Sequence, residues 1–182
     1  MPPPFRSKPT PEQRAELAAL YAETDALMAK MTCDASTDCC RFGVTGREPY
    51  PTAIEAADLL RAFAATGKRM QTTPMTAVGG PSRGMHQKGH DRDRAQKSGA
   101  RNGNARRLPL VDTERRCPML SAEGRCVVYA SRPFGCRTFF CVRAQGEEPP
   151  RSRINDLGRR IADLSARYEP RDPGPRPLTR LF

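Results

Sequence analysis

The chain has 182 residues, with 31 Lys and Arg against 20 Asp and Glu, seven cysteines and no tryptophan. Its length allows one core-bearing domain of modest size, and a mean hydropathy of -0.67 with 37% hydrophobic residues indicates that part of the chain lies outside any core. No stretch approaches the ~20 apolar residues that cross a bilayer, and the N-terminus lacks the apolar run of a secretion signal, so we expect a cytoplasmic protein with no membrane contact.

The first predicted helix begins close to the N-terminus. Residues 1–9 are rich in Pro and are expected to be disordered. Thr10 and Gln13 have the spacing of a capping box, and a proline follows the threonine at the first helical position. Apolar residues then recur every three or four positions, which predicts a helix over about residues 11–30.

Two further helices are predicted by the same kinds of pattern. Thr52 and Glu55 repeat the capping spacing, and the apolar stripe that follows them stops at Gly67. Beyond Ser152, apolar residues recur at steps of three and four until Pro170 closes the helix. This last stripe is the clearest in the chain, and we expect it to pack in the core: Ile154, Leu157, Ile161, Leu164 and Tyr168.

Most of the net charge of +11 lies in one segment. Residues 68–116 hold 12 basic and 4 acidic residues, a balance of +8. We expect residues 68–108 to form a disordered insertion, which either attracts nucleic acid or an acidic protein through nonspecific electrostatics or is solvated with no ligand. The chain's two histidines, His86 and His90, lie in it among glycines that disfavour a helix, so both are expected to be solvent-exposed.

The seven cysteines form two groups, which are candidate metal ligands. Thiolates are soft anionic ligands suited to zinc or to an iron cluster, and neighbouring thiolates repel one another unless a cation neutralises them. The alternative, that the cysteines are buried as small hydrophobes, fits poorly with several of them beside charged residues. Neither group has four well-spaced thiols, so we expect both to converge on one centre. The groups are Cys33, Cys39 and Cys40, then Cys117, Cys126, Cys136 and Cys141.

Two stretches carry these cysteines in a distinctive order. Residues 33–40 contain CDASTDCC, and residues 117–139 contain CPML, GRCVVY, RP and CRTF in that order. Together they resemble the YkgJ-type cysteine-cluster family, whose first box is CxxCxxCC. The resemblance implies a domain that chelates zinc or iron. A similar box occurs in flagellin lysine methylases, which implies a cluster-dependent enzyme as an alternative.

One position departs from the pattern of this family. Ser36 stands where the family has its second cysteine, and a neutral hydroxyl is a poor substitute for a thiolate on zinc or iron. Cys141 lies five residues beyond Cys136 and either restores the missing ligand in space or packs with Phe139 and Phe140. The first-choice ligands are the positions that match the family, with Cys141 standing in for Ser36: Cys33, Cys39, Cys40, Cys117, Cys126 and Cys136.

The adjacency of Cys39 and Cys40 limits how both can bind one ion. In an extended segment neighbouring side chains point to opposite faces, so two ligands here require a bent backbone. Otherwise only one of them is a ligand, or the site holds more than one metal atom. Two separate four-thiolate zinc sites need eight sulfurs unless one bridges, whereas one 4Fe-4S cluster needs four, so seven thiols favour an iron-sulfur centre slightly over zinc.

Arg132 and Arg137 are singled out by the same resemblance. A fixed positive charge beside thiolates lowers their pKa and offsets part of the negative charge of a cluster. The ordinary alternative is a surface arginine. We weigh that alternative equally for Arg132 and less for Arg137, because Arg137 directly follows a proposed ligand.

Three classes of function remain, and a metal-binding protein with a structural or redox-active zinc or iron site is favoured. The enzyme alternative has little support from the residues, because no phosphate-binding glycine loop and no Ser/His/Asp set accompanies the cysteines. The third class is a zinc-stabilised nucleic-acid binder that uses the basic insertion as an electrostatic arm. Whether the protein is an enzyme therefore stays open.

The predicted fold is small and mostly α, with helices packed around cysteine-bearing loops that form a metal centre. No repeat, heptad array or series of strands accompanies the helical stripes. The expected layout is a disordered N-terminus (1–9), two helices with the first cysteine group (10–67), the basic insertion (68–108), the second cysteine group with the last helix (109–168) and a Pro/Arg-rich tail (169–182).

Overall fold

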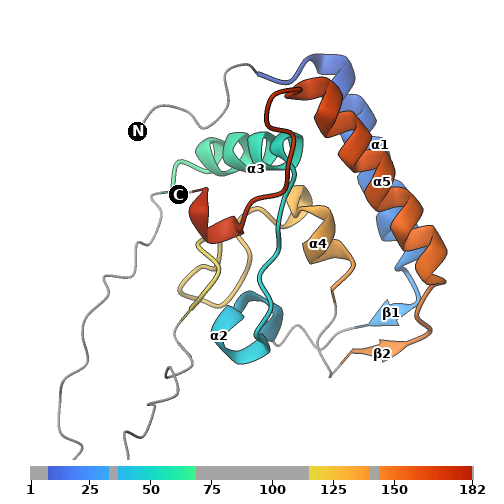
Figure 1. Cartoon of the computed structure of the whole chain (residues 1–182). Helices are drawn as coiled ribbons and strands as arrows, with labels where there is room; N and C mark the ends of the chain where they lie inside the picture. Colours follow the sequence, from blue (N-terminus) through green and yellow to red (C-terminus); the bar gives the residue numbers. More distant parts are fainter. Residues whose placement is uncertain (1–7, 33–36, 69–114, 140–143, 182) are drawn as a thin grey trace, which may run out of the picture. The chain divides into compact units, whose positions relative to one another are not determined.

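The computed structural model describes residues 8–32, 37–68, 115–139 and 144–181 (Figure 1). All the described residues belong to one compact unit. The predicted basic insertion beyond Lys68, with both histidines, lies outside the described residues.

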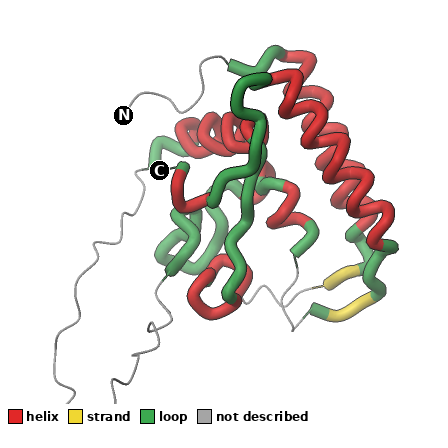
Figure 2. Tube along the Cα trace, viewed as in Figure 1, coloured by secondary structure: helices red, strands yellow, loops and turns green. Residues whose placement is uncertain are grey.

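Helices dominate the described residues, of which 54% are helical and 5% lie in strands (Figure 2). This confirms the small, mostly α fold predicted from the sequence. None of the described helices is long and apolar enough to span a membrane. The α-helices are α1 (Pro11–Leu27), α2 (Phe42–Thr45), α3 (Ala53–Ala65), α4 (Phe134–Arg137) and α5 (Arg151–Tyr168), and short 3₁₀ helices cover Asp38–Cys40, Tyr129–Ser131 and Leu178–Arg180.

The first and second predicted helices begin where their capping residues place them. The Thr10 hydroxyl accepts a hydrogen bond from the Gln13 N–H at 3.2 Å, and the Gln13 side chain accepts one from the Thr10 N–H at 2.9 Å. At the start of α3, the Thr52 N–H donates to the Glu55 carboxylate at 2.9 Å. Each cap satisfies backbone donors that the helix leaves open, a contribution of about 1 kcal/mol.

A short antiparallel sheet sets the end of α1. β1 (Met31–Thr32) pairs with β2 (Gln145–Gly146). Gly146 has a φ of +124°, and a Cβ there would collide with the Lys30 carbonyl, so this close approach requires glycine. The first helix was expected to reach about Lys30, but it ends at Leu27 because the chain has to turn before it enters β1.

The core forms where α1, α3 and α5 pack together. α1 and α5 lie side by side along most of their length (Figure 1). The apolar stripe predicted for α5 faces this core: Leu157, Ile161, Leu164 and Tyr168 are buried, and Ile154 is half-buried. The tail also contributes, because Leu178 and Leu181 are buried. Burying a large apolar side chain contributes roughly 1.5–3 kcal/mol, so this face accounts for much of the stability of α5.

Glu55 joins three helices through one buried carboxylate. It is only 2% exposed. Its Oε1 accepts hydrogen bonds from the Phe134 N–H of α4 at 2.6 Å and from the Tyr21 hydroxyl of α1 at 3.3 Å. Its Oε2 accepts from the N–H and the hydroxyl of Thr52, both at 2.9 Å. Burial raises the pKa of Glu55, and these four donors offset part of that rise.

Glu55→Gln should therefore destabilise the fold by about 2 kcal/mol, measured by urea or guanidinium unfolding. Glutamine keeps one acceptor oxygen but places an NH2 donor against two of the donors that Glu55 satisfies. The matched control is Asp163→Asn on the exposed face of α5, which should change stability by less than ~0.5 kcal/mol. Equal stability of the two variants would contradict the assigned role of Glu55.

Candidate metal centre

Cys39 and Cys40 lie in the 3₁₀ helix Asp38–Cys40, whose backbone is bent. Thr37, directly before it, is the one non-glycine residue among those described that has a positive φ, at 59°. The bend brings the Cys39 and Cys40 sulfurs to 3.9 Å from each other. The sequence required a bent backbone if both thiols were to serve one centre, and the structure has that bend.

Backbone hydrogen bonds join the first cysteine group to Cys117. The Cys117 N–H donates to the Cys40 carbonyl at 2.7 Å, and the Gly43 N–H donates to the Arg115 carbonyl at 3.0 Å. Cys117 is buried, whereas Cys40 is half-buried. These two bonds hold together segments that lie some 75 residues apart in the sequence, so the two cysteine groups meet without depending on side-chain contacts alone.

Cys126 and Cys136 are positioned by the chain that follows. Cys126 forms an isolated β-bridge with Leu120, and the neighbouring Val127 N–H donates to the carbonyl of buried Met119 at 2.9 Å. Cys136 lies on α4, where its N–H donates to the Pro133 carbonyl at 2.8 Å. Both thiols are half-buried.

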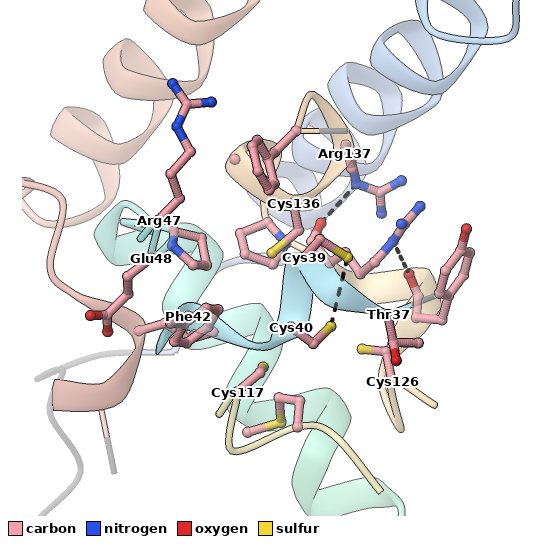
Figure 3. A pocket seen from close by; sticks show the side chains of 18 of the residues that line it. Thr37, Cys39, Cys40, Phe42, Arg47, Glu48, Cys117, Cys126, Cys136 and Arg137 are labelled. Atoms are coloured by element: carbon pink, nitrogen blue, oxygen red, sulfur yellow. Dashed lines mark hydrogen bonds between the residues drawn. The ribbon is translucent and has the colours of Figure 1, made fainter. Parts of the chain in front are cut away.

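The five described cysteines all line one cavity of about 1180 Å³. Figure 3 shows their sulfurs gathered from the 3₁₀ helix, the segment at Cys117, the loop at Cys126 and α4. None of the five forms a disulfide. Cys33, Ser36 and Cys141 lie outside the described residues, so the exchange of ligands expected between Ser36 and Cys141 falls outside them as well.

The arrangement of these side chains is a shared cavity and not a formed coordination shell. Within the described ranges, no group of three or more His, Cys, Asp or Glu side chains has a geometry that could hold a metal ion. The donor chemistry of the cavity nevertheless suits zinc or iron, because thiols are the ligand type that both metals take in structural and electron-transfer sites.

The surroundings of the thiols disfavour bare thiolates. A hydrogen bond with the Cys117 thiol, together with burial, raises the pKa of Cys40 to about 12. The pKa of Cys39 is raised well above the usual range by the hydrogen bond between the Cys39 and Cys40 thiols and by burial. Burial, followed by the neighbouring thiols of Cys40 and Cys126, does the same for the pKa of Cys136. A bound cation would supply the positive charge that these thiols need in order to ionise.

The buried Arg137 side chain joins the segment before Cys136 to α1. Arg137 is 5% exposed. Its Nε donates to the Arg132 carbonyl at 2.7 Å, and its other nitrogens donate to the Ala130 carbonyl and to the Asp25 carboxylate of α1. Its guanidinium also stacks over the Tyr21 ring, 4.1 Å from the centroid. Arg137 is thus a buried scaffold residue, and its charge is paired with Asp25.

Arg132 is the arginine whose charge acts on the sulfurs. Its positive charge lowers the pKa values of Cys39, Cys126 and Cys136, although burial and neighbouring thiols outweigh it. From the sequence, Arg137 had the stronger claim to a place beside the ligands because it follows Cys136. In the structure, the Arg137 guanidinium pairs with Asp25, whereas the charge of Arg132 acts on three of the thiols.

No protein-family model, curated protein or solved structure matches this chain. The fold and the cysteine cavity therefore stand on the chain's own contacts, and the likeness of its cysteine strings to a known family stays a sequence-based expectation.

In the metal-free protein, Cys40 should react with iodoacetamide far more slowly than in the urea-unfolded chain. A pKa of about 12, against the ordinary 9.0, leaves roughly a thousandfold less thiolate at pH 8, and only the thiolate reacts. The rate should keep rising about tenfold per pH unit up to pH 10. Peptide mass spectrometry measures alkylation at this site. A rate in the folded protein that levels off near pH 9 would contradict the assignment.

Proposed function

We propose that this protein binds zinc or iron through its cysteines, in one centre to which both cysteine groups contribute. The observation that carries the proposal is that five thiols from distant parts of the chain line one cavity. Burial and neighbouring thiols keep these groups protonated in the absence of a cation, and a bound metal would supply the positive charge that lets them ionise. A cytoplasmic location belongs to the proposal, because a reducing compartment keeps the thiols available.

The proposed ligands come from both sides of the undescribed middle of the chain. Cys39, Cys40, Cys117, Cys126 and Cys136 are the described members, and Cys33 and Cys141 complete the set expected from the sequence. The described members supply five thiols, one more than a four-thiolate site needs, and a metal would have to draw them closer together than they lie in this structure. Bound zinc would supply a structural cross-link, and a bound iron-sulfur cluster would supply electron transfer. The likeness to the YkgJ-type family supports a chelating role for the matched cysteines.

Metal binding at these residues would be coupled to folding. The segments that carry the thiols are joined mostly by single backbone hydrogen bonds and one-turn helices, which contribute little stability alone. Binding at a thiolate site contributes ~10 kcal/mol or more, which is comparable to the whole stability of a small domain. The long helices α1, α3 and α5 have their own apolar core, so the metal-free protein is expected to stay folded with a lower Tm.

Cys126→Ser and Cys136→Ser should each lower the bound zinc or iron per chain, measured by elemental analysis of protein purified without air. Each should also lower the Tm, because serine is a poor ligand for either metal. The matched control is Ala130→Ser, which adds the same hydroxyl at an exposed position of the chain between the two cysteines. It should keep full metal content and an unchanged Tm. Full occupancy in both cysteine variants would contradict the convergent site.

A further inference from the structure

Arg132 is held in a fixed orientation at the wall of the cysteine cavity. Its Nε donates to the Tyr129 carbonyl at 3.1 Å, and its guanidinium carbon lies 3.6 Å from the centroid of the Tyr129 ring. The backbone contact fixes one edge of the guanidinium and the ring covers one face. The two terminal nitrogens are left to donate elsewhere, and they form the planar fork that binds carboxylate and phosphate groups.

The acidic side chains around the cavity do not neutralise Arg132. Asp25 pairs with Arg137, and Glu48 pairs with Arg115. Within the described residues, no carboxylate forms an ion pair with Arg132.

Two more arginines of the cavity wall also lack a carboxylate partner among the described residues. Arg47 stacks on the Phe139 ring at 5.0 Å, and neither Arg47 nor Arg125 forms an ion pair with a described carboxylate. Among the described acidic residues that line the cavity, Glu123 is the one that is not paired with another arginine and could balance these three guanidinium groups. The described lining of the cavity therefore has three arginines without a carboxylate partner and one carboxylate to balance them.

The cavity is also larger than a metal centre requires. Its volume of about 1180 Å³ exceeds the ~300–1,000 Å³ typical of pockets for small organic ligands. Tyr129, which is 63% exposed, offers an apolar surface beside Arg132. Both residues also line a neighbouring cavity of about 400 Å³.

We propose that the cysteine cavity contains an anion site at Arg132, which binds the carboxylate or phosphate group of a small organic molecule. Arg132 donates two parallel hydrogen bonds to that group, and Tyr129 packs against the apolar body of the ligand. The site goes beyond metal binding, and Arg132 is oriented by its contacts with Tyr129 and not by any ligand.

The test uses benzoate and phenyl phosphate as probes, titrated into the purified full-length protein by calorimetry. The wild type should bind at least one probe, and the tighter probe identifies the recognised group. Arg132→Gln should weaken binding about tenfold or more, since a charge-assisted bidentate pair is lost, and Arg132→Lys should weaken it less because the charge remains. The control Arg159→Gln removes an exposed arginine of α5 and should bind as the wild type does.

Metal content measured on the same samples separates this proposal from the proposed function. Probe binding that depends on Arg132 supports the anion site whatever the metal content. Failure of both probes to bind the wild type overturns it, and so does equal binding by the wild type and Arg132→Gln. If neither probe binds and Arg132→Gln loses metal, Arg132 offsets the charge of the metal centre instead, and the metal proposal stands without the anion site.

Discussion

The placement of α4, which carries Cys136, depends on the contacts of Tyr21. Tyr21 lies in α1 and is buried, with its ring under the Arg137 guanidinium and its hydroxyl on the Glu55 carboxylate. Burial, and the charge of Glu55, raise the pKa of Tyr21 well above its usual value, so the hydroxyl stays protonated and donates. Arg137 and Glu55 in turn hold the chain around α4 from opposite ends. The Tyr21 side chain thereby contacts both buried charges, Arg137 and Glu55, that hold the segment with Cys136. A buried charge without such partners would be strongly destabilising.

The sequence predicted the long helices because their determinants are local. Capping residues and apolar spacing marked α1, α3 and α5, and the mostly α fold is confirmed. The end of α1 was placed about one turn too late, since it is set by the pairing of β1 with a strand more than 110 residues away. Glu55 shows the same limit: its capping role was visible, but its bond to the Phe134 N–H, 79 residues on, was not.

The cysteines of the candidate site could be predicted from the sequence, but the way the arginines are arranged around them could not. Chemistry alone indicated that both cysteine groups would meet, and the five described thiols do line one cavity. The parts played by the arginines had to be seen in space. Arg137 is next to Cys136 in sequence, yet its guanidinium binds Asp25 and two backbone carbonyls, whereas Arg132 acts on three thiols and is left without a carboxylate partner among the described residues. Sequence adjacency fixes where a backbone runs but not which way a long side chain turns.

Native mass spectrometry of the protein purified without air tests the central claim most directly. The account predicts that the folded protein carries zinc, iron or iron with sulfide beyond the 20.2 kDa chain, and that the added mass disappears when the protein is denatured with a chelator. The size of the added mass also identifies the metal. A folded protein that has the mass of the bare chain, and that takes up neither zinc nor iron when they are supplied to its reduced thiols, would contradict the account.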